Sequence, residues 1–176
     1  MHTPHIVRLC AKPPSPAATG RSMPDGLTPD QAAFWAAFLA SPTAPPDADA
    51  RFHSVFAIGF GSDAGATLIL SGTKTATSSL PAEFQDIAPP IPGSLSLLTG
   101  TGGRPMGIVE TLSITPLPLG QMDEAFSAAY AEWPDHAALI QGMIECYQGV
   151  DPGFTAETPL LAERFRLIWP SPKSPA

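Results

Sequence analysis

The chain has 176 residues, a net charge of −7 and only 14% charged residues. This length favours a single domain whose core needs no disulfide or metal to stabilise it. The acidic balance argues against a protein that binds long nucleic acid through its phosphates, because such proteins present a basic surface. We therefore expect no strong affinity for long RNA or DNA, whereas a nucleoside, a nucleotide or a short RNA remains a compatible partner.

The cysteine and histidine content argues against a metal centre. Cys10 and Cys146 are the two cysteines and lack a metal-ligand spacing, and the four histidines are scattered along the chain. We expect no metal and no cofactor. The cysteine usage favours a reduced, cytoplasmic compartment. No apolar run approaches the roughly 18 residues that a membrane-spanning helix needs, so no membrane association is expected.

Composition divides the chain into three segments. Residues 1–26 are rich in Pro, Ala, Ser and Gly and predict a flexible extension, and residues 171–176 predict a flexible tail. The apolar periodicity lies between them, so one folded domain is expected over residues 27–170.

Two helices are predicted in the first part of the domain. A helix is predicted over residues 28–40, with Thr28 as N-cap, Pro29 at the first helical position and Gln31 completing a capping box. A second, largely buried helix is predicted over residues 62–71 because of its apolar run after Ser-Asp.

The remaining segments alternate between strand and helix patterns. Short strands mixed with helices, without a regular strand–helix–strand rhythm, predict an α+β fold built on a small curved sheet or barrel with flanking helices. Glycine-rich TGTGGRP predicts a turn between two strands. The strands are predicted over residues 55–60, 94–99, 106–115 and 160–169, and the helices over residues 121–132 and 134–148.

Lys74 is the single lysine between Lys12 and Lys173. A lysine shielded from water loses its proton more easily, so it can act as a base or nucleophile, or it can hold an anionic group. The alternative is a solvated turn lysine. Thr77 follows three residues later, where its hydroxyl could serve as a nucleophile for acyl transfer or could simply belong to a strand.

Two carboxylates fall on apolar faces of predicted strands. Alternation places Glu110 on the face of Ile108, and Glu163 on the face of Phe165. A carboxylate in such a place needs a partner or a cavity, so a functional site and a structural ion pair are both open. Arg164 faces the other way, where it could contact phosphate or solvent.

The segment FGSDAGATLILSGTKTATSSL resembles the signature stretch of the ASCH family. That stretch has a helix ending in Ser-Gly, then a basic residue, Lys, Thr, a small residue and Thr, which matches SGTKTAT here. Further matches follow in order at PGSLSLL, GIVETLSITPLPLGQMDEAF and LLAERFRLIWP. The resemblance covers about residues 28–170 and implies a PUA-like mixed β-barrel with flanking helices.

The resemblance also implies RNA-related functions. Some members are amidohydrolases that remove the acetyl group from acetylated cytidine, others are described as ribonucleases, and others belong to transcription coactivator assemblies. In the deacetylase members a Lys, a Thr three residues later and a Glu carry catalysis, and Lys74 and Thr77 match the first two. The expected glutamate falls at Tyr130, with Glu132 two residues beyond it and Glu110 as a second candidate.

We therefore expect one pocket at a barrel opening. Amide hydrolysis of a modified cytidine is the leading chemistry that the resemblance implies, and a non-catalytic RNA- or nucleotide-binding module or a ribonuclease is the alternative. The expected catalytic residues are Lys74, Thr77, Glu132 and Glu110, and the expected substrate-binding residues are Thr75, Tyr130, Glu163 and Arg164.

Overall fold

The structure is a computed structural model that describes residues 26–58, 63–84 and 87–170. The segments predicted to be flexible, 1–26 and 171–176, lie almost wholly outside these ranges. The predicted cap at Ser62 also lies outside them. In chain order the main elements are α1 (Pro29–Leu39), β1 (Phe52–Ala57), α2 (Asp63–Leu70), β2 (Ala76–Ser79), β3 (Leu95–Thr99), β4 (Pro105–Pro118), α3 (Glu124–Tyr130), α4 (His136–Gln148) and β5 (Pro159–Trp169).

One sheet organises the domain, with the strand order β1-β3-β4-β5-β2. β1 runs parallel to β3, and the other neighbouring pairs are antiparallel. β1 and β2 are the two edges, and no pairing joins them in the described part of the chain. The sheet is therefore open, so the predicted closure into a PUA-like β-barrel is wrong, although the mixed fold with flanking helices is confirmed.

A cavity between β1 and β2 explains why the two edge strands do not pair. Residues of both β1 and β2 line one cavity. Hydrogen-bonded closure would bring neighbouring strands to about 5 Å from each other, which would eliminate this space. The curved sheet therefore keeps a cavity where a closed barrel would have a further strand pair.

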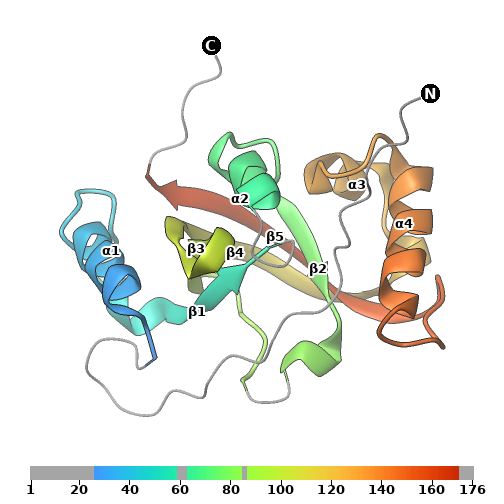
Figure 1. Cartoon of the computed structure of the whole chain (residues 1–176), viewed down its shortest axis with the longest axis horizontal. Helices are drawn as coiled ribbons and strands as arrows, with labels where there is room; N and C mark the ends of the chain where they lie inside the picture. The colour runs from blue at the N-terminus through green and yellow to red at the C-terminus, as the bar shows by residue number, and fades with distance from the viewer. Residues whose placement is uncertain (1–25, 59–62, 85–86, 171–176) are drawn as a thin grey trace.

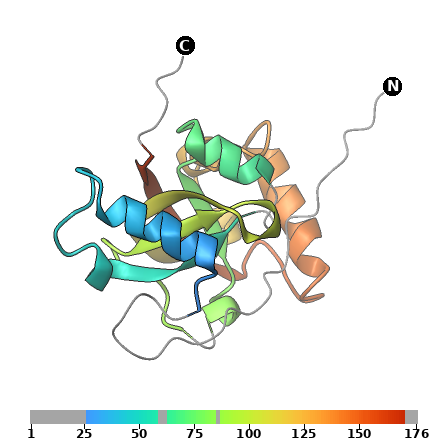
Figure 2. The same cartoon turned by 60° about the vertical axis from the view of Figure 1, so that its left-hand side comes forward.

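The helices cover different parts of the sheet (Figure 1). α1 lies at one end, α3 and α4 lie at the other, and α2 lies between them. The turned view shows α1 lying across the strands (Figure 2). None of the helices in the described ranges combines the length and apolarity that crossing a bilayer requires.

α1 follows its sequence signals. Thr28 Oγ1 accepts a hydrogen bond from the Gln31 backbone at 3.3 Å, and Gln31 Oε1 accepts one from the Thr28 backbone at 3.1 Å. The predicted capping box is thus confirmed. The apolar face buries Trp35 and Phe38 completely, and Trp35 packs edge-on against Phe52 of β1 at 4.8 Å between ring centroids.

Register shifts interrupt the alternation that was predicted in β4. They occur between Ile108 and Val109 and between Thr111 and Ser113. Ile108 packs in the core under α1, whereas Val109 packs in the core under α2. Leu112, which strict alternation would place on the same face as Ile108, is 47% exposed. A bulge adds one residue to a strand and shifts the faces of those that follow, and the apolar pattern did not reveal it.

Glu110 lies on the α1 side of the sheet. It is directly opposite Leu95 of β3, whose side chain is in the core under α1, and directly opposed residues share a face. Arg51 Nη2 contacts one of its carboxylate oxygens, and Arg166 Nε donates to the other at 2.7 Å. The structure thus places Glu110 in an ion-pair cluster and not in the expected pocket.

The Glu110 cluster predicts a measurable contribution to stability. The Glu110 side chain is only 14% exposed, so Glu110→Gln should lower the free energy of unfolding by about 1–2 kcal/mol, because a neutral amide binds two guanidinium groups less strongly. The matched control is Asp47→Asn, since Asp47 pairs with the same Arg51 at 3.6 Å but is 68% exposed. That change should cost less than about 0.5 kcal/mol in urea unfolding. Equal effects of the two variants would contradict this assignment.

Candidate active site

A cavity of about 360 Å³ lies on one face of the sheet. Ser96 and Val109 line it, whereas their strand neighbours Leu95, Leu97 and Ile108 pack under α1. Because side chains alternate between faces along a strand, the cavity opens on the face opposite α1. Its volume is in the range of small-molecule sites.

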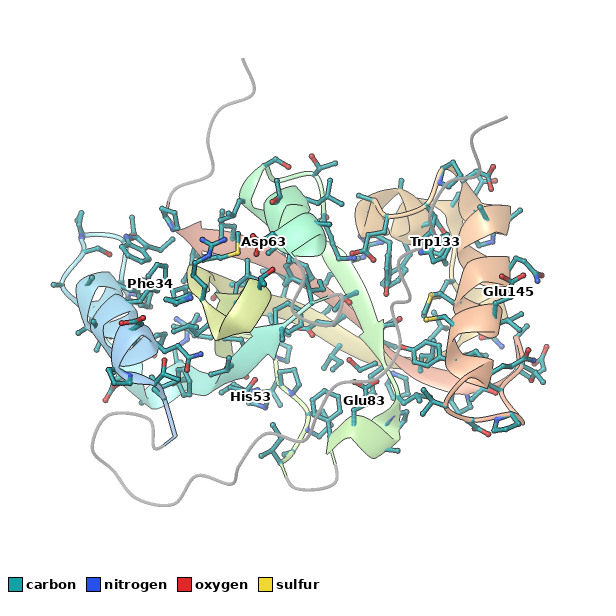
Figure 3. All side chains as sticks on the ribbon, viewed as in Figure 1. Phe34, His53, Asp63, Glu83, Trp133 and Glu145 are labelled. Atoms are coloured by element: carbon teal, nitrogen blue, oxygen red, sulfur yellow. The ribbon has the colours of Figure 1, made fainter. Side chains whose placement is uncertain are left out.

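The walls of the cavity come from distant parts of the chain. β1 and β2 supply its two sides, and the turn after β3 and the end of α3 complete it. Figure 3 labels His53 on β1 and Glu83, whose short helical turn follows β2. Both residues line the cavity, as do four of the residues expected to be catalytic or substrate-binding: Thr77, Tyr130, Glu132 and Glu163.

The turn after α2 directs Lys74 into the interior. The backbone N–H groups of Thr73 and Lys74 both donate to the Leu68 carbonyl at 3.0 Å, and Gly72 has a φ of 78°. A left-handed residue at this place ends a helix and reverses the chain, and glycine adopts it without strain. Lys74 is consequently 1% exposed, so the solvated turn lysine that was the alternative is wrong.

The buried ammonium group of Lys74 has three partners. Nζ donates to the Tyr130 carbonyl at 2.9 Å and lies 3.5 Å from Glu132 Oε2. It also lies 3.5 Å from the centroid of the Tyr130 ring, in cation–π geometry. Lys74 is therefore compensated by a carbonyl dipole, a carboxylate and an aromatic face, as a buried cation requires.

Glu132 reaches Lys74 because α3 ends at Tyr130. The next residue, Ala131, has a left-handed backbone with a φ of 60°, which is uncommon outside glycine. This turn directs the Tyr130 carbonyl and the Glu132 carboxylate toward the same ammonium group. Of the two carboxylates expected as catalytic partners, the structure brings Glu132 to Lys74 and leaves Glu110 on the opposite face.

Burial shifts the protonation equilibria of this cluster. It lowers the pKa of Lys74 to about 8, although the neighbouring Glu132 carboxylate opposes the shift. Burial also raises the pKa of Glu132, and the neighbouring Lys74 charge opposes this rise. Tyr130 has a pKa of about 12, raised first by burial and then by the Glu132 charge. A neutral amine form of Lys74 is thus accessible near neutral pH.

Thr77 and Glu163 face each other across the β2–β5 pair. They are register partners, Thr77 is 6% exposed, and both line the cavity. The side chains of Thr77 and Ser78 interact with the Tyr130 phenol and partly oppose its raised pKa. Glu163 accepts a hydrogen bond from Thr111 Oγ1 at 2.7 Å. The Thr77 hydroxyl therefore belongs to the same polar cluster as the Lys74 group.

Two expected substrate-binding residues do not line the cavity. The Arg164 guanidinium lies 5.4 Å from the centre of the Phe126 ring, which places it against α3. Thr75 acts through its backbone, donating to the Ala129 carbonyl at 2.8 Å and accepting from Phe165. Both residues hold β2 and β5 to their neighbours, so the structure gives them positions in the framework.

Several lining residues had no signal in the sequence. Tyr147 of α4 has the periodicity of a core residue, and His53 and Phe84 stood out by no motif. They meet because the fold brings β1, the turn after β2 and α4 to one cavity. The described residues hold no cluster of three potential metal ligands, and the site is built from hydroxyls, carboxylates, aromatic rings and one amine.

Trp133 connects the Glu132 turn to α4, where Figure 3 shows it labelled. A Cβ atom added at Gly142 would lie 2.1 Å from the benzo-ring atoms Cη2 and Cζ3 of Trp133. Such a contact is impossible without movement, so the indole lies directly on the α4 backbone. Because Gly142 has no side chain, Trp133, the residue after Glu132, can pack in this position.

This close approach predicts that the effect of Gly142→Ala on the free energy of unfolding depends on whether the Trp133 indole is present. Gly142→Ala should lower the free energy of unfolding by about 1–3 kcal/mol, because the indole must shift. In a Trp133→Leu background the same change should be neutral or stabilising by up to about 1 kcal/mol, because alanine favours a helix. Urea unfolding of the four proteins measures both values. An equal cost in the two backgrounds would exclude the indole contact as the cause.

The lowered pKa of Lys74 predicts a pH-dependent stability. The folded group releases its proton near pH 8 and the unfolded group near 10.5, so the unfolded chain binds more protons between these values. The free energy of unfolding of the wild type, measured relative to Lys74→Met, should therefore rise from pH 8 to 9.5. Urea unfolding at several pH values tests this, and parallel curves for the two proteins would contradict it.

Comparison with known proteins places the fold. No curated protein matches the chain. A crystal structure of an ASCH domain from Lactobacillus crispatus matches with a TM-score of 0.69 at 22% identity, covering 82% of this chain and 97% of that one. A crystal structure of a protein from Enterococcus faecalis matches with a TM-score of 0.58 at 20% identity, covering 79% and 92%. The sequence pattern of the ASCH domain matches residues 55–168, so the chain belongs to the ASCH domain family.

Proposed function

We propose that the cavity binds an acylated nucleoside and hydrolyses its amide bond, with a modified cytidine as the substrate class. The observation that carries this proposal is the burial of Lys74 beside Glu132, which lines the cavity together with Thr77. A lysine whose pKa is near 8 can exchange protons at physiological pH. The same three residue types carry catalysis in the deacetylases that the sequence resembles.

In the proposed reaction Thr77 is the nucleophile. Its oxygen attacks the acyl carbon, and the hydroxyl proton passes to the neutral amine of Lys74. The C–N bond then breaks, and the nucleoside amine leaves with that proton. Water attacks the resulting Thr77 ester and gives one proton to the Lys74–Glu132 pair. The bond between the acyl carbon and the Thr77 oxygen then breaks, that proton returns to the Thr77 oxygen, and the carboxylic acid departs. The net change is amide plus water to carboxylic acid plus amine, with Thr77 regenerated.

Tyr130 and the cavity walls have supporting roles in this proposal. The Tyr130 phenol keeps its proton because its pKa is about 12, so it can donate a hydrogen bond to the substrate or to Thr77. Phe84 and Tyr147 provide aromatic surfaces in the same cavity, and nucleobases stack on such surfaces. A nucleobase with an acyl-amide group therefore suits the chemical character of the lining.

A non-catalytic nucleoside- or RNA-binding module is the second candidate. It is favoured by the position of Lys74, whose ammonium group is engaged with Tyr130 and Glu132 while other residues form the cavity surface. In this case Lys74 would maintain the shape of the cavity, and the ligand would be bound without chemistry.

Point variants distinguish the two candidates. Lys74→Met, Thr77→Val and Glu132→Gln should each lower the rate of acetylcytidine hydrolysis by about 10²–10⁴-fold, because each removes a group that moves a proton or attacks the acyl carbon. Thr77→Ser should retain turnover, since the hydroxyl persists. The wild-type rate should fall below about pH 8, where Lys74 becomes protonated. Release of cytidine, followed by chromatography, measures these rates.

Glu110→Gln is the matched control for Glu132→Gln. It makes the same chemical change on the opposite face of the sheet, so the hydrolysis rate should stay within about twofold of wild type. Thermal melting in parallel identifies variants that fail to fold. If the wild type binds acetylcytidine but releases no cytidine, the amidohydrolase proposal fails and the binding module is favoured.

A further inference from the structure

Gly65 of α2 lies directly against the carboxylate of Glu132. A Cβ atom added at Gly65 would lie 2.9 Å from Glu132 Oε1 and 2.7 Å from Ile58 Cγ2. Non-bonded heavy atoms pack at about 3.5–4.0 Å, so a side chain on this residue would require one of the two neighbours to move. Gly65 is buried, and its bare Cα therefore forms part of the wall around the Glu132 carboxylate.

The two neighbours of Gly65 differ in their freedom to move. Ile58 is 5% exposed and packs in the core under α2, and its Cγ2 methyl is attached to a branched Cβ whose rotamers are restricted. Glu132 Oε1 lies at the far end of a flexible side chain that borders the cavity. An added methyl group would therefore displace the carboxylate more easily than the isoleucine.

The contact with Lys74 holds the carboxylate only loosely. Glu132 Oε2 lies 3.5 Å from Lys74 Nζ, which is longer than the roughly 2.7–2.9 Å of a strong hydrogen bond between charged groups. The Glu132 side chain is nevertheless only 10% exposed. Packing against Gly65 thus limits the positions of a carboxylate that the ion pair alone does not fix.

The glycine is unfavourable for the helix that carries it. Glycine lowers helix stability relative to alanine, and α2 has alanine on both sides of Gly65, at Ala64 and Ala66. Room for the Glu132 carboxylate gives this departure from alanine a physical reason.

We propose that Gly65 is a positioning residue for Glu132, because its missing side chain leaves the space in which the carboxylate lies beside Lys74. The same helix holds Lys74, since the Leu68 carbonyl accepts the hydrogen bonds of the Thr73 and Lys74 N–H groups in the turn after α2. α2 therefore positions both members of the pair. The inference rests on the proposed function for the role of the pair in hydrolysis, whereas the position of the carboxylate does not depend on that function.

Gly65→Ala tests the position of the carboxylate through the pKa of Lys74. The chain has three lysines, so ¹³C-labelled lysine gives few NMR signals, and the Lys74 signal is the one lost in Lys74→Met. Glu132 raises the pKa of Lys74 against the larger effect of burial. Displacing the carboxylate by about 1 Å should change that pKa by about half a pH unit or more. Equal pKa values in the wild type and Gly65→Ala would overturn the proposal.

The same substitution in a Glu132→Ala background separates positioning from a general change in packing. With the carboxylate absent, Gly65→Ala should leave the pKa of Lys74 unchanged, because the vacated space accommodates the added methyl group. If the methyl group instead moved α2, it would alter the burial of Lys74, which is the main cause of the lowered pKa. The pKa would then change in both backgrounds, and that outcome would overturn the proposal.

Unfolding measurements keep the test decisive if Gly65→Ala does not fold. Folding restored by Glu132→Ala would locate the clash at the carboxylate and support the proposal. Failure to fold in both backgrounds would assign Gly65 to the packing of Ile58 and overturn it.

Gly120→Ala is the matched control. An added Cβ atom there would lie 3.3 Å from both the Cβ atom and the carbonyl oxygen of Ala156. The variant thus introduces a tight contact that involves neither Lys74 nor Glu132, and the pKa of Lys74 should be unchanged. A change equal to that in Gly65→Ala would contradict the proposed role of Gly65.

Hydrolysis of acetylcytidine connects the inference to the proposed function. Gly65→Ala should lower kcat by about tenfold or more with little change in KM, because a displacement of about 1 Å can cost up to about 10²-fold. If the wild type shows no hydrolysis, the amidohydrolase proposal fails, while the pKa of Lys74 still decides the position of Glu132. A changed pKa with an unchanged kcat would support the positioning and contradict the use of Glu132 in hydrolysis.

Discussion

The burial of the Lys74 ammonium group is the constraint on which the site depends. An interior cation requires compensation, and here the Tyr130 carbonyl, the Tyr130 ring and the Glu132 carboxylate supply it. These groups lie at the end of α3, while Lys74 lies between α2 and β2, so one charge joins three elements. The same burial lowers the pKa of Lys74 to about 8, which links the packing of the domain to its proposed proton chemistry.

The sheet separates two uses of charged residues. On the α1 side, Glu110 is bound by Arg51 and Arg166, and the cluster ties β4 to β5 and to the turn before β1. On the opposite side, Glu132 lines the cavity and lies 3.5 Å from the buried Lys74 ammonium group. Glu110 and Glu132 therefore have different partners because they lie on opposite faces of the sheet. The open edges of β1 and β2 keep the cavity-bearing face accessible to a small ligand.

Local signals in the sequence predicted much of the fold and two of the three residues proposed to be catalytic. The capping box at Thr28, the buried α2 and the strands of the centre of the sheet follow from periodicity and turn chemistry. Lys74 and Thr77 were found because they lie three residues apart in one segment. The sequence did not decide whether Glu132 or Glu110 lies beside Lys74. That choice depends on the left-handed turn at Ala131, and an alanine in a sequence does not indicate a positive φ.

The sequence by itself determined the elements, the ASCH resemblance and the Lys-Thr pair, since these depend on residues that are close along the chain. Tertiary structure decided that the sheet stays open, that bulges in β4 place Leu112 at the surface, and that Glu83, Glu163 and Tyr147 share a cavity with Thr77. The physical reason is that side-chain alternation predicts a face only while strand register is unbroken, and contacts between distant segments depend on sheet curvature, which apolar periodicity does not encode.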